Sequence, residues 1–417
     1  MINIQENYLW FGYNPINLND DSWLYDFHNE DYIYDLNESK KILDLCFDNI
    51  LDNLQIKGVQ CVPLSGGLDS RYILGALRER LNSNEIIAYS FGKPGQLDYE
   101  IAKKICKNFN IKHYLINLNE VDFSYNSLLE SVGYAKWTYM PDAYIQTLGY
   151  KLATDLNCEN IWSGFMGDFL TGGHYSGNEK YRIEDFIKSQ KRSLKIKNDK
   201  DFIFNQFNGF YDFEVNSVIR FNEFLDFKIR QKNCISKIIL GETKLNTWSA
   251  RQNTFYQNVE IITPFLDKVW AGYWLNMPRE LHKNQKRYKE LGLSKYTKLF
   301  DIPFKYQYGT NSSILRFFRR FSNSLSTIMH NKYPKLNCRL GIMDNYLNYP
   351  IDLKKSKDWL RSLEYLIYFM KENDLEYEDI VLNHLNGKEN NAEDIILLLG
   401  LVLNLDYISG KGNSIGN

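Results

Sequence analysis

The sequence has no clusters of cysteine or histidine. Its six cysteines and six histidines are scattered over 417 residues, and no CxxC, HxxxH or HExxH pair occurs. A structural zinc site, an iron–sulfur cluster and the common metal-hydrolase sites all need clustered ligands, so the sequence supports none of them. In a chain of this length, dispersed cysteines are typical of small buried side chains rather than of a disulfide framework.

Neither sign of charge is in excess, and no hydrophobic run is long. Fifty Lys and Arg residues face 51 Asp and Glu residues, a net charge of -1, whereas proteins that bind a nucleic-acid backbone usually carry a basic excess. The longest apolar run, residues 395–403, is much shorter than the about 20 residues that cross a bilayer. The first residues lack the basic and apolar regions of a signal peptide. We therefore expect no membrane or nucleic-acid partner and a cytoplasmic location.

What the chain does contain is enough apolar material for a sizeable core. Hydrophobic residues make up 44% of the sequence and aromatic residues 15%. Overall disorder is therefore excluded, and the length predicts two or three domains or one large α/β unit with additions.

Strand and helix patterns alternate in the first third of the chain. An amphipathic helix is predicted at residues 38–54, and a further strand at 158–164 ends in a glycine-containing turn. Between them, short apolar runs and amphipathic patterns follow one another at residues 58–64, 71–81, 85–92, 97–109 and 112–118. This strand–helix–strand order predicts an α/β fold with a doubly wound parallel sheet and helices on both faces.

The rest of the chain has a different pattern. Residues 176–235 are charged and irregular, and beyond residue 310 helical patterns predominate. In residues 357–370 the apolar positions form one stripe, and residues 391–405 are apolar enough for a buried helix. The sequence therefore predicts helical additions and a mostly α C-terminal region.

The segment that indicates chemistry is Pro63-Leu-Ser-Gly-Gly-Leu-Asp-Ser-Arg71, between a predicted strand and a predicted helix. The unpaired N–H groups and the dipole at such a helix start suit an anion, and the glycines allow its close approach. Asp69 would repel a phosphate unless it holds Mg²⁺ against it. A Walker A loop is excluded because no GK[ST] follows. An ordinary glycine-rich turn is the alternative.

The SGGLDS run resembles the pyrophosphate loop (PP-loop) of ATP pyrophosphatases, which cleave ATP between the α- and β-phosphates. Four further segments, in the same order and spacing, resemble the synthetase domain of asparagine synthetases, whose relatives include β-lactam synthetases and lasso-peptide cyclases. They are YSFG (89–92), SGFMGDFLTGGH (163–174), VEIITPFLD (259–267) and PFKYQYG (303–309). The resemblance covers roughly residues 40–320.

The resemblance implies ATP and Mg²⁺ as cofactors and three catalytic residues. Asp69 and Asp168 would hold the metal, and Lys305 would neutralise charge that develops on the α-phosphate and pyrophosphate. The implied nucleotide contacts are Leu64, Ser65, Gly66, Gly67, Leu68, Asp69, Ser70, Ser90, Phe91, Ser163 and Gly164. Two alternatives stay open from the residues alone, since Asp168 could instead cap a helix and Lys305 could be a solvated lysine.

The resemblance also divides the chain. Residues 1–40 are expected to form an N-terminal extension, 41–320 the ATP-binding synthetase domain with a variable insertion at 176–235, and 321–417 a helical C-terminal region. Glutamine-dependent members begin with a nucleophilic cysteine that heads a glutaminase domain, whereas Met1 is followed by Ile2 here. We therefore expect a stand-alone synthetase that does not release ammonia from glutamine itself.

A second departure from the family concerns the acceptor side of the site. Phe165 and Phe169 stand where the family has glutamates. Asparagine formation is therefore in doubt, and an apolar wall made by Phe165, with Gly167 beside it, predicts a bulkier acceptor amine. In the 259–267 segment, Pro264 and Asp267 are expected to be structural.

Together these features predict an AMP-forming ligase that adenylates a carboxylate and transfers the acyl group to an amine, giving an amide. The expected partners are a small-molecule or peptide carboxylate, an amine, and a separate protein that supplies one of them. A biosynthetic pathway that makes a peptide natural product or modifies a glycan would use this reaction. The alternatives are a lasso-type peptide cyclase, a degenerate nucleotide-binding subunit and a tRNA-modifying pyrophosphatase.

Overall fold

A five-stranded parallel sheet forms the centre of the protein, with strand order β3-β2-β1-β4-β5. The computed structural model describes residues 33–54, 56, 58–132, 140–165, 167–173, 259–304, 325, 347–373 and 375–410. The strands are β1 (Val59–Pro63), β2 (Ile86–Gly92), β3 (Lys112–Asn117), β4 (Cys158–Trp162) and β5 (Glu260–Ile262). The predicted parallel sheet is confirmed, and β5 is a strand that the sequence patterns did not predict.

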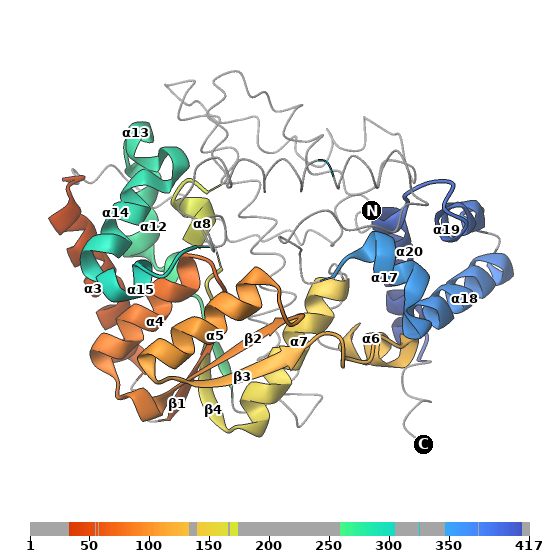
Figure 1. Cartoon of the computed structure of the whole chain (residues 1–417), viewed down its shortest axis with the longest axis horizontal. Helices are drawn as coiled ribbons and strands as arrows, with labels where there is room; N and C mark the ends of the chain where they lie inside the picture. The colour runs from red at the N-terminus through yellow and green to blue at the C-terminus, as the bar shows by residue number, and fades with distance from the viewer. Residues whose placement is uncertain are drawn as a thin grey trace.

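Helices cover both faces of this sheet, as predicted (Figure 1). Alternate residues of β1 point to different cores. Val62 packs with α4 (Asp69–Arg80) and α5 (Leu97–Phe109), whereas Cys61 packs with α7 (Met140–Asp155). The fold is therefore an α/β doubly wound sheet, and the helices change faces between β1 and β4.

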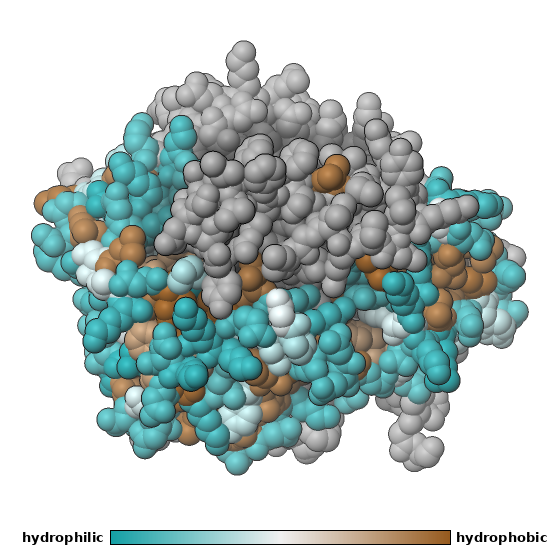
Figure 2. Space-filling view, viewed as in Figure 1, coloured by the Kyte–Doolittle hydropathy of each residue, from teal (hydrophilic) through white to brown (hydrophobic). Residues whose placement is uncertain are grey.

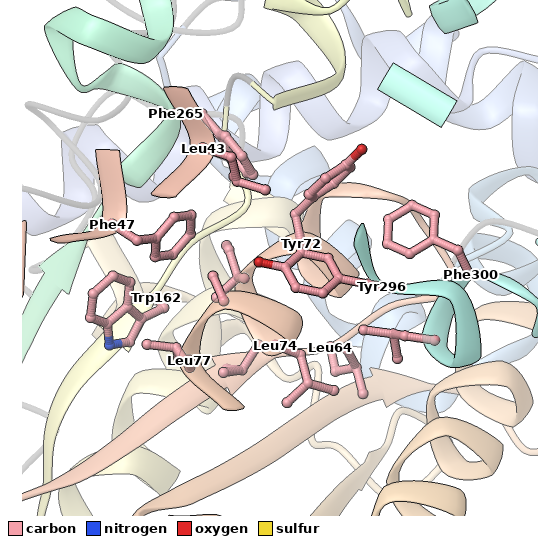
Figure 3. Close-up of a cluster of buried hydrophobic side chains, with 14 of the residues drawn as sticks. Leu43, Phe47, Leu64, Tyr72, Leu74, Leu77, Trp162, Phe265, Tyr296 and Phe300 are labelled. Carbon is pink, nitrogen blue, oxygen red and sulfur yellow. The ribbon is translucent and has the colours of Figure 1, made fainter. Parts of the chain in front are cut away.

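The larger core joins segments that are far apart in the chain (Figure 3). Phe47 of α3 (Leu36–Leu54) stacks on Trp162 at the end of β4, with ring centroids 5.8 Å apart. Phe265 and Tyr296 reach the same core from much later in the sequence. Residues after 259 thus complete the core that the first strands begin.

Several short helices follow β5 and lie around that core. They are α12 (Lys268–Asn276), α13 (Arg279–His282), α14 (Lys286–Lys295) and α15 (Thr297–Phe300), with α8 (Gly167–Leu170) before them. Single 3₁₀ turns cover Ser83–Glu85, Pro264–Leu266 and Lys283–Gln285. The Asp267 carboxylate caps α12 by accepting hydrogen bonds from the amides of Val269 and Trp270, so the structure gives this residue a structural contact.

The C-terminal helices form a second core against α6 (Tyr125–Val132) and part of α7. They are α17 (Tyr349–Lys355), α18 (Lys357–Glu372), α19 (Glu378–Leu385) and α20 (Ala392–Ile408). The predicted buried helix is α20, which is buried around most of its circumference. On α18 the expected stripe is buried at Trp359, Leu363, Leu366 and Met370, while Ile367 is only partly buried and Phe369 completes the face.

On the face that Figure 2 shows, hydrophilic residues cover most of the described surface, and hydrophobic residues occur in small groups between them. None of the described helices combines the length and the hydropathy needed to span a membrane. The predicted irregular segment 176–235 lies outside the described residues.

The Gly75→Ala variant tests the packing of α4 against Tyr296, which lies between α14 and α15. An added Cβ at this buried position would lie 2.8 Å from the ring of Tyr296. Alanine usually favours a helix by about 1 kcal/mol over glycine, but overpacking costs about 1–3 kcal/mol. We therefore expect a net loss of about 1 kcal/mol in urea unfolding, and a smaller loss in a Tyr296→Ala background. A gain of stability would show that the ring moves aside without cost.

Candidate active site

Two loops meet at the carboxyl edge of the sheet, at the point where the helices change faces. Residues 64–68 follow β1, and residues 163–166 follow β4, which is the neighbour of β1. In open α/β sheets, ligands bind in the crevice outside the carboxyl ends of the strands at such a switch point. The predicted PP-loop and the predicted second aspartate segment therefore lie together where a ligand is expected.

The PP-loop is closed by its own serines. The Ser65 amide donates a hydrogen bond to Ser70 Oγ at 3.1 Å, and the two hydroxyl oxygens are 3.2 Å apart. The Gly67 amide donates to Ser65 Oγ at 3.1 Å. These bonds fold the chain back on itself between β1 and α4, which gathers several amides at one place.

Asp98, in the first turn of α5, also contacts this loop, a contact that the sequence motifs did not predict. Its Oδ1 accepts a hydrogen bond from the Gly66 amide at 3.1 Å. A Cβ at position 66 would lie 2.9 Å from the same oxygen, so only glycine fits there without a shift. The amide of the loop thus already binds one carboxylate oxygen, as expected for an anion-binding turn.

Asp69 is the first residue of α4 and faces the second loop. Its Oδ1 accepts a hydrogen bond from the hydroxyl of Tyr288 at 2.7 Å, and it is also hydrogen-bonded to the backbone amide of Asp168. Burial and the nearby charge of Asp168 raise the pKa of Asp69 well above its ordinary value, while the two hydrogen bonds act in the opposite direction. The structure thus brings together the two predicted metal ligands.

The second loop can approach Asp69 only because it carries glycines. A Cβ at Gly164 would lie 3.1 Å from the Asp69 Cβ, and a Cβ at Gly167 would lie 2.4 Å from Asp69 Oδ1. At the latter distance the Asp69 carboxylate would have to move to admit a side chain. Gly164 and Gly167, which were predicted to bind nucleotide and acceptor, therefore also have a steric role, because they leave room for Asp69.

The donor set fits a magnesium ion that is shared with phosphate groups. Two carboxylates that repel each other in this way are stabilised by a divalent cation, and Mg²⁺ in nucleotide sites commonly takes one or two carboxylates plus phosphate oxygens. Within the described ranges no group of three His, Cys, Asp or Glu side chains could hold a metal by itself. Asp69 and Asp168 would hold the ion, and phosphates and water would complete its shell.

Arg71 connects the PP-loop to the segment that leads to Lys305. Its fully buried guanidinium donates to the carbonyl of Gly66 on one side and to those of Leu299, Ile302 and Pro303 on the other. It also lies 4.5 Å from the ring centroid of Phe304. Burial lowers the pKa of Arg71 to about 10, and the charge of Asp98 opposes this. The side chain therefore stays charged at neutral pH.

The predicted nucleotide contacts Ser90 and Phe91 lie at the end of β2. The buried Ser90 hydroxyl donates to the carbonyl of Leu64 at 2.6 Å, and it is 2.8 Å from Nε2 of His113. Burial lowers the pKa of His113 to about 4, so this imidazole is neutral. Phe91 is partly buried and packs against both smaller cores. Ser90 thus ties β2 to the start of the PP-loop.

The remaining predicted site residues differ in what the structure says of them. Asp168 is exposed in α8, and Phe165 is half-buried against the larger core. Lys305 lies outside the described residues, and so does the side chain of Phe169. The roles assigned to all these residues stay predictions. Asp98, Arg71 and Tyr288 were missed, although Arg71 follows directly on SGGLDS and Asp98 lies only six residues after the YSFG segment.

Part of the chain is similar to the asparagine synthase family. Residues 54–222 match the sequence model of that family, which is described as asparagine synthase. This stretch includes the PP-loop, the β2 edge and the segment around Asp168. The resemblance that the motifs indicate is confirmed, and an ATP-using synthetase or ligase is the enzyme class that it supports.

Curated relatives of two kinds are similar to this chain. A 7-cyano-7-deazaguanine synthase of Staphylococcus epidermidis is 26% identical over 152 residues, which are 34% of this chain and 66% of the relative. A protein of the same name from Staphylococcus saprophyticus has the same identity and coverage. A putative glutamine-hydrolysing asparagine synthetase of Methanocaldococcus jannaschii is 27% identical over 191 residues, 42% of this chain and 34% of the relative. The chain thus spans less than two thirds of these relatives.

The Asp69→Asn variant is expected to be more stable than the wild type at neutral pH in the absence of nucleotide. Because burial and Asp168 raise the folded-state pKa of Asp69 above 3.8, ionised Asp69 lowers stability once the pH rises through that pKa. The advantage of the asparagine variant should therefore shrink as the pH falls, and vanish where Asp69 is protonated in both states. Thermal unfolding of both proteins across pH measures this. An advantage that grows toward acid would contradict the assignment.

Proposed function

We propose that the protein is an ATP-dependent, AMP-forming ligase that joins a carboxylate to an amine. A carboxylate oxygen of the substrate attacks the α-phosphorus of ATP, and pyrophosphate leaves with the bonding electrons. The nitrogen of the amine then attacks the acyl carbon, AMP leaves, and the amine loses a proton to solvent. A free carboxylate is a poor electrophile, whereas the acyl-adenylate carries a good leaving group.

The observation that carries this proposal is the contact of Asp69 with the loop after β4. At the switch point of the sheet, Asp69 of the PP-loop lies directly against the second aspartate segment, because a Cβ at Gly164 would be 3.1 Å from the Asp69 Cβ and one at Gly167 2.4 Å from Asp69 Oδ1. Phosphoryl chemistry of this kind depends mainly on positioning and charge neutralisation, and both need such a fixed junction. The asparagine synthase match over residues 54–222 supports the same reaction class.

Each site residue has a role in this proposal. Asp69 and Asp168 hold Mg²⁺, which neutralises charge on the phosphates when it is bound. The Ser65–Ser70 loop binds the pyrophosphate. Lys305 supplies positive charge to the leaving pyrophosphate. Arg71 donates a hydrogen bond to the carbonyl of Pro303, two residues before Lys305, and so fixes the backbone at that point.

The proposed nucleophile is an amine larger than ammonia that is carried on its own substrate. Phe165 stands where the family has a glutamate, and its half-buried ring packs against the larger core. A cationic or ammonia-like nucleophile is better bound beside a carboxylate, whereas an apolar wall suits a neutral, partly desolvated amine. The proposed partners are therefore a carboxylate substrate, an amine substrate and a separate protein that supplies one of them.

A second candidate is the formation of a nitrile, which the names of the Staphylococcus relatives suggest. These relatives are 7-cyano-7-deazaguanine synthases, and the similarity covers 66% of their length. A nitrile carbon forms from a carboxylate and ammonia when both carboxylate oxygens are lost in turn, so this route needs ammonia and two activations. Mass spectrometry of the product distinguishes an amide from a nitrile.

The first test of the proposal is the identity of the nucleotide products. With purified protein, Mg²⁺ and a library of carboxylates, we expect AMP and pyrophosphate, and carboxylate-dependent exchange of labelled pyrophosphate into ATP. Asp69→Asn should lower the exchange rate by at least about 10²-fold while the protein stays folded. Asn82→Asp, an exposed change away from the loops, is the control and should leave the rate unchanged. ADP and phosphate as products would refute the proposal.

The second test concerns the nucleophile. Phe165→Glu should lower amide formation about tenfold and leave pyrophosphate exchange nearly unchanged, because adenylation and amine attack use different walls of the site. Phe165→Leu keeps an apolar wall and serves as the matched variant, with a smaller loss expected. Ammonium, glutamine and candidate amines are offered separately. Efficient amide formation from glutamine by this chain alone would disprove the proposed nucleophile.

A further inference from the structure

Tyr288 places a buried hydroxyl on the carboxylate that the proposed function assigns to the metal. The residue lies in α14, is fully buried, and donates its hydroxyl hydrogen to Asp69 Oδ1 at 2.7 Å. Packing of the ring into the core would need no hydroxyl. The hydrogen bond joins positions that are 219 residues apart in the sequence, so the tertiary fold delivers this donor to the PP-loop.

The surroundings of Tyr288 hold its ring in one orientation. It stacks on Tyr72 with ring centroids 4.4 Å apart and an interplanar angle of 17°. The rings of Trp270 and Trp274 meet it edge-on, at 6.2 and 5.6 Å. In addition, the hydroxyl of Tyr72 donates to the backbone carbonyl of Tyr288. The phenol therefore has little freedom to turn its hydroxyl away from Asp69.

We propose that Tyr288 is a positioning residue that orients Asp69 for the divalent cation. An ionised carboxylate has about four lone-pair sites. The Tyr288 hydroxyl occupies one of them and fixes the side chain from the side of α14. The remaining sites serve a cation. Hydrogen-bond partners of metal ligands commonly change metal affinity by about 10- to 100-fold when they are removed. This inference rests on the proposed function only through the metal role of Asp69.

The chain offers a matched control for this role. Tyr288→Phe and Tyr72→Phe each remove one buried hydroxyl that donates one hydrogen bond, and the two rings stack on each other. Only the hydroxyl of Tyr288 reaches Asp69. A merely structural role predicts similar effects of the two changes, whereas a positioning role predicts a difference in metal binding.

The experiment measures Mn²⁺ binding by electron paramagnetic resonance in the presence of α,β-methylene-ATP, which cannot be cleaved at the bond proposed to break. We expect Tyr288→Phe to weaken Mn²⁺ binding about tenfold and Tyr72→Phe to change it less than about twofold. The two variants should have similar melting temperatures. In an Asp69→Asn background, Tyr288→Phe should cause no further loss of nucleotide affinity.

Three results would overturn the inference. They are wild-type Mn²⁺ affinity in Tyr288→Phe, an equal loss in Tyr72→Phe, and nucleotide binding by the wild type that does not depend on Mn²⁺. The measurement needs no ligation reaction. A failure of the inference on Tyr288 can therefore be told apart from a failure of the proposed function. Wild-type protein that binds Mn²⁺ and nucleotide through Tyr288 and Asp69, yet forms no AMP with any carboxylate, would leave this inference standing and refute the ligase.

Discussion

The pairing of β1 with β4 is the constraint on which the candidate site depends. It joins strands that are about a hundred residues apart and sets the loops after them side by side. The buried side chain of Gln60 supports the register, because its Oε1 accepts hydrogen bonds from Asn160 Nδ2 at 2.9 Å and from Trp162 Nε1 at 2.8 Å. A slip of one residue would turn these polar groups away from each other and leave them unpaired in the core. The register thus determines whether Asp69 meets Asp168.

Two charged side chains at the base of the PP-loop fix the backbone of Gly66. Asp98 binds the amide of Gly66, and Arg71 binds its carbonyl. The two peptide groups flanking this glycine are therefore held from opposite sides by side chains of opposite charge. The same arginine donates hydrogen bonds to the carbonyls of Leu299 and Ile302 at the end of α15. The guanidinium of Arg71 thus binds both the PP-loop and the end of α15.

The sequence predicted those parts of the fold that depend on local patterns. The alternation of strands and helices up to residue 118 and the buried helix α20 follow from hydrophobic periodicity, and both are present. Likewise, SGGLDS identified the loop and Asp69. Tyr288 could not be found in this way, because a tyrosine in an ordinary amphipathic helix carries no local signal. Its contact with Asp69 arises only when α14 packs against α4, and the short strand β5 likewise exists only through its pairing with β4.

The shared core also bears on how the protein can be divided. Trp162, Phe47 and Tyr72 pack in one cluster with Phe265, Trp270 and Tyr288, which come from beyond residue 259. A truncated chain ending at residue 222, where the family match ends, would expose this apolar surface and leave Arg71 without three of its four carbonyl acceptors. The stretch that matches the family therefore ends well before the last residues that belong to the larger core. The matched stretch is only part of the segments that form this core, and a fragment that keeps the core has to reach from Ile42 to Ile302.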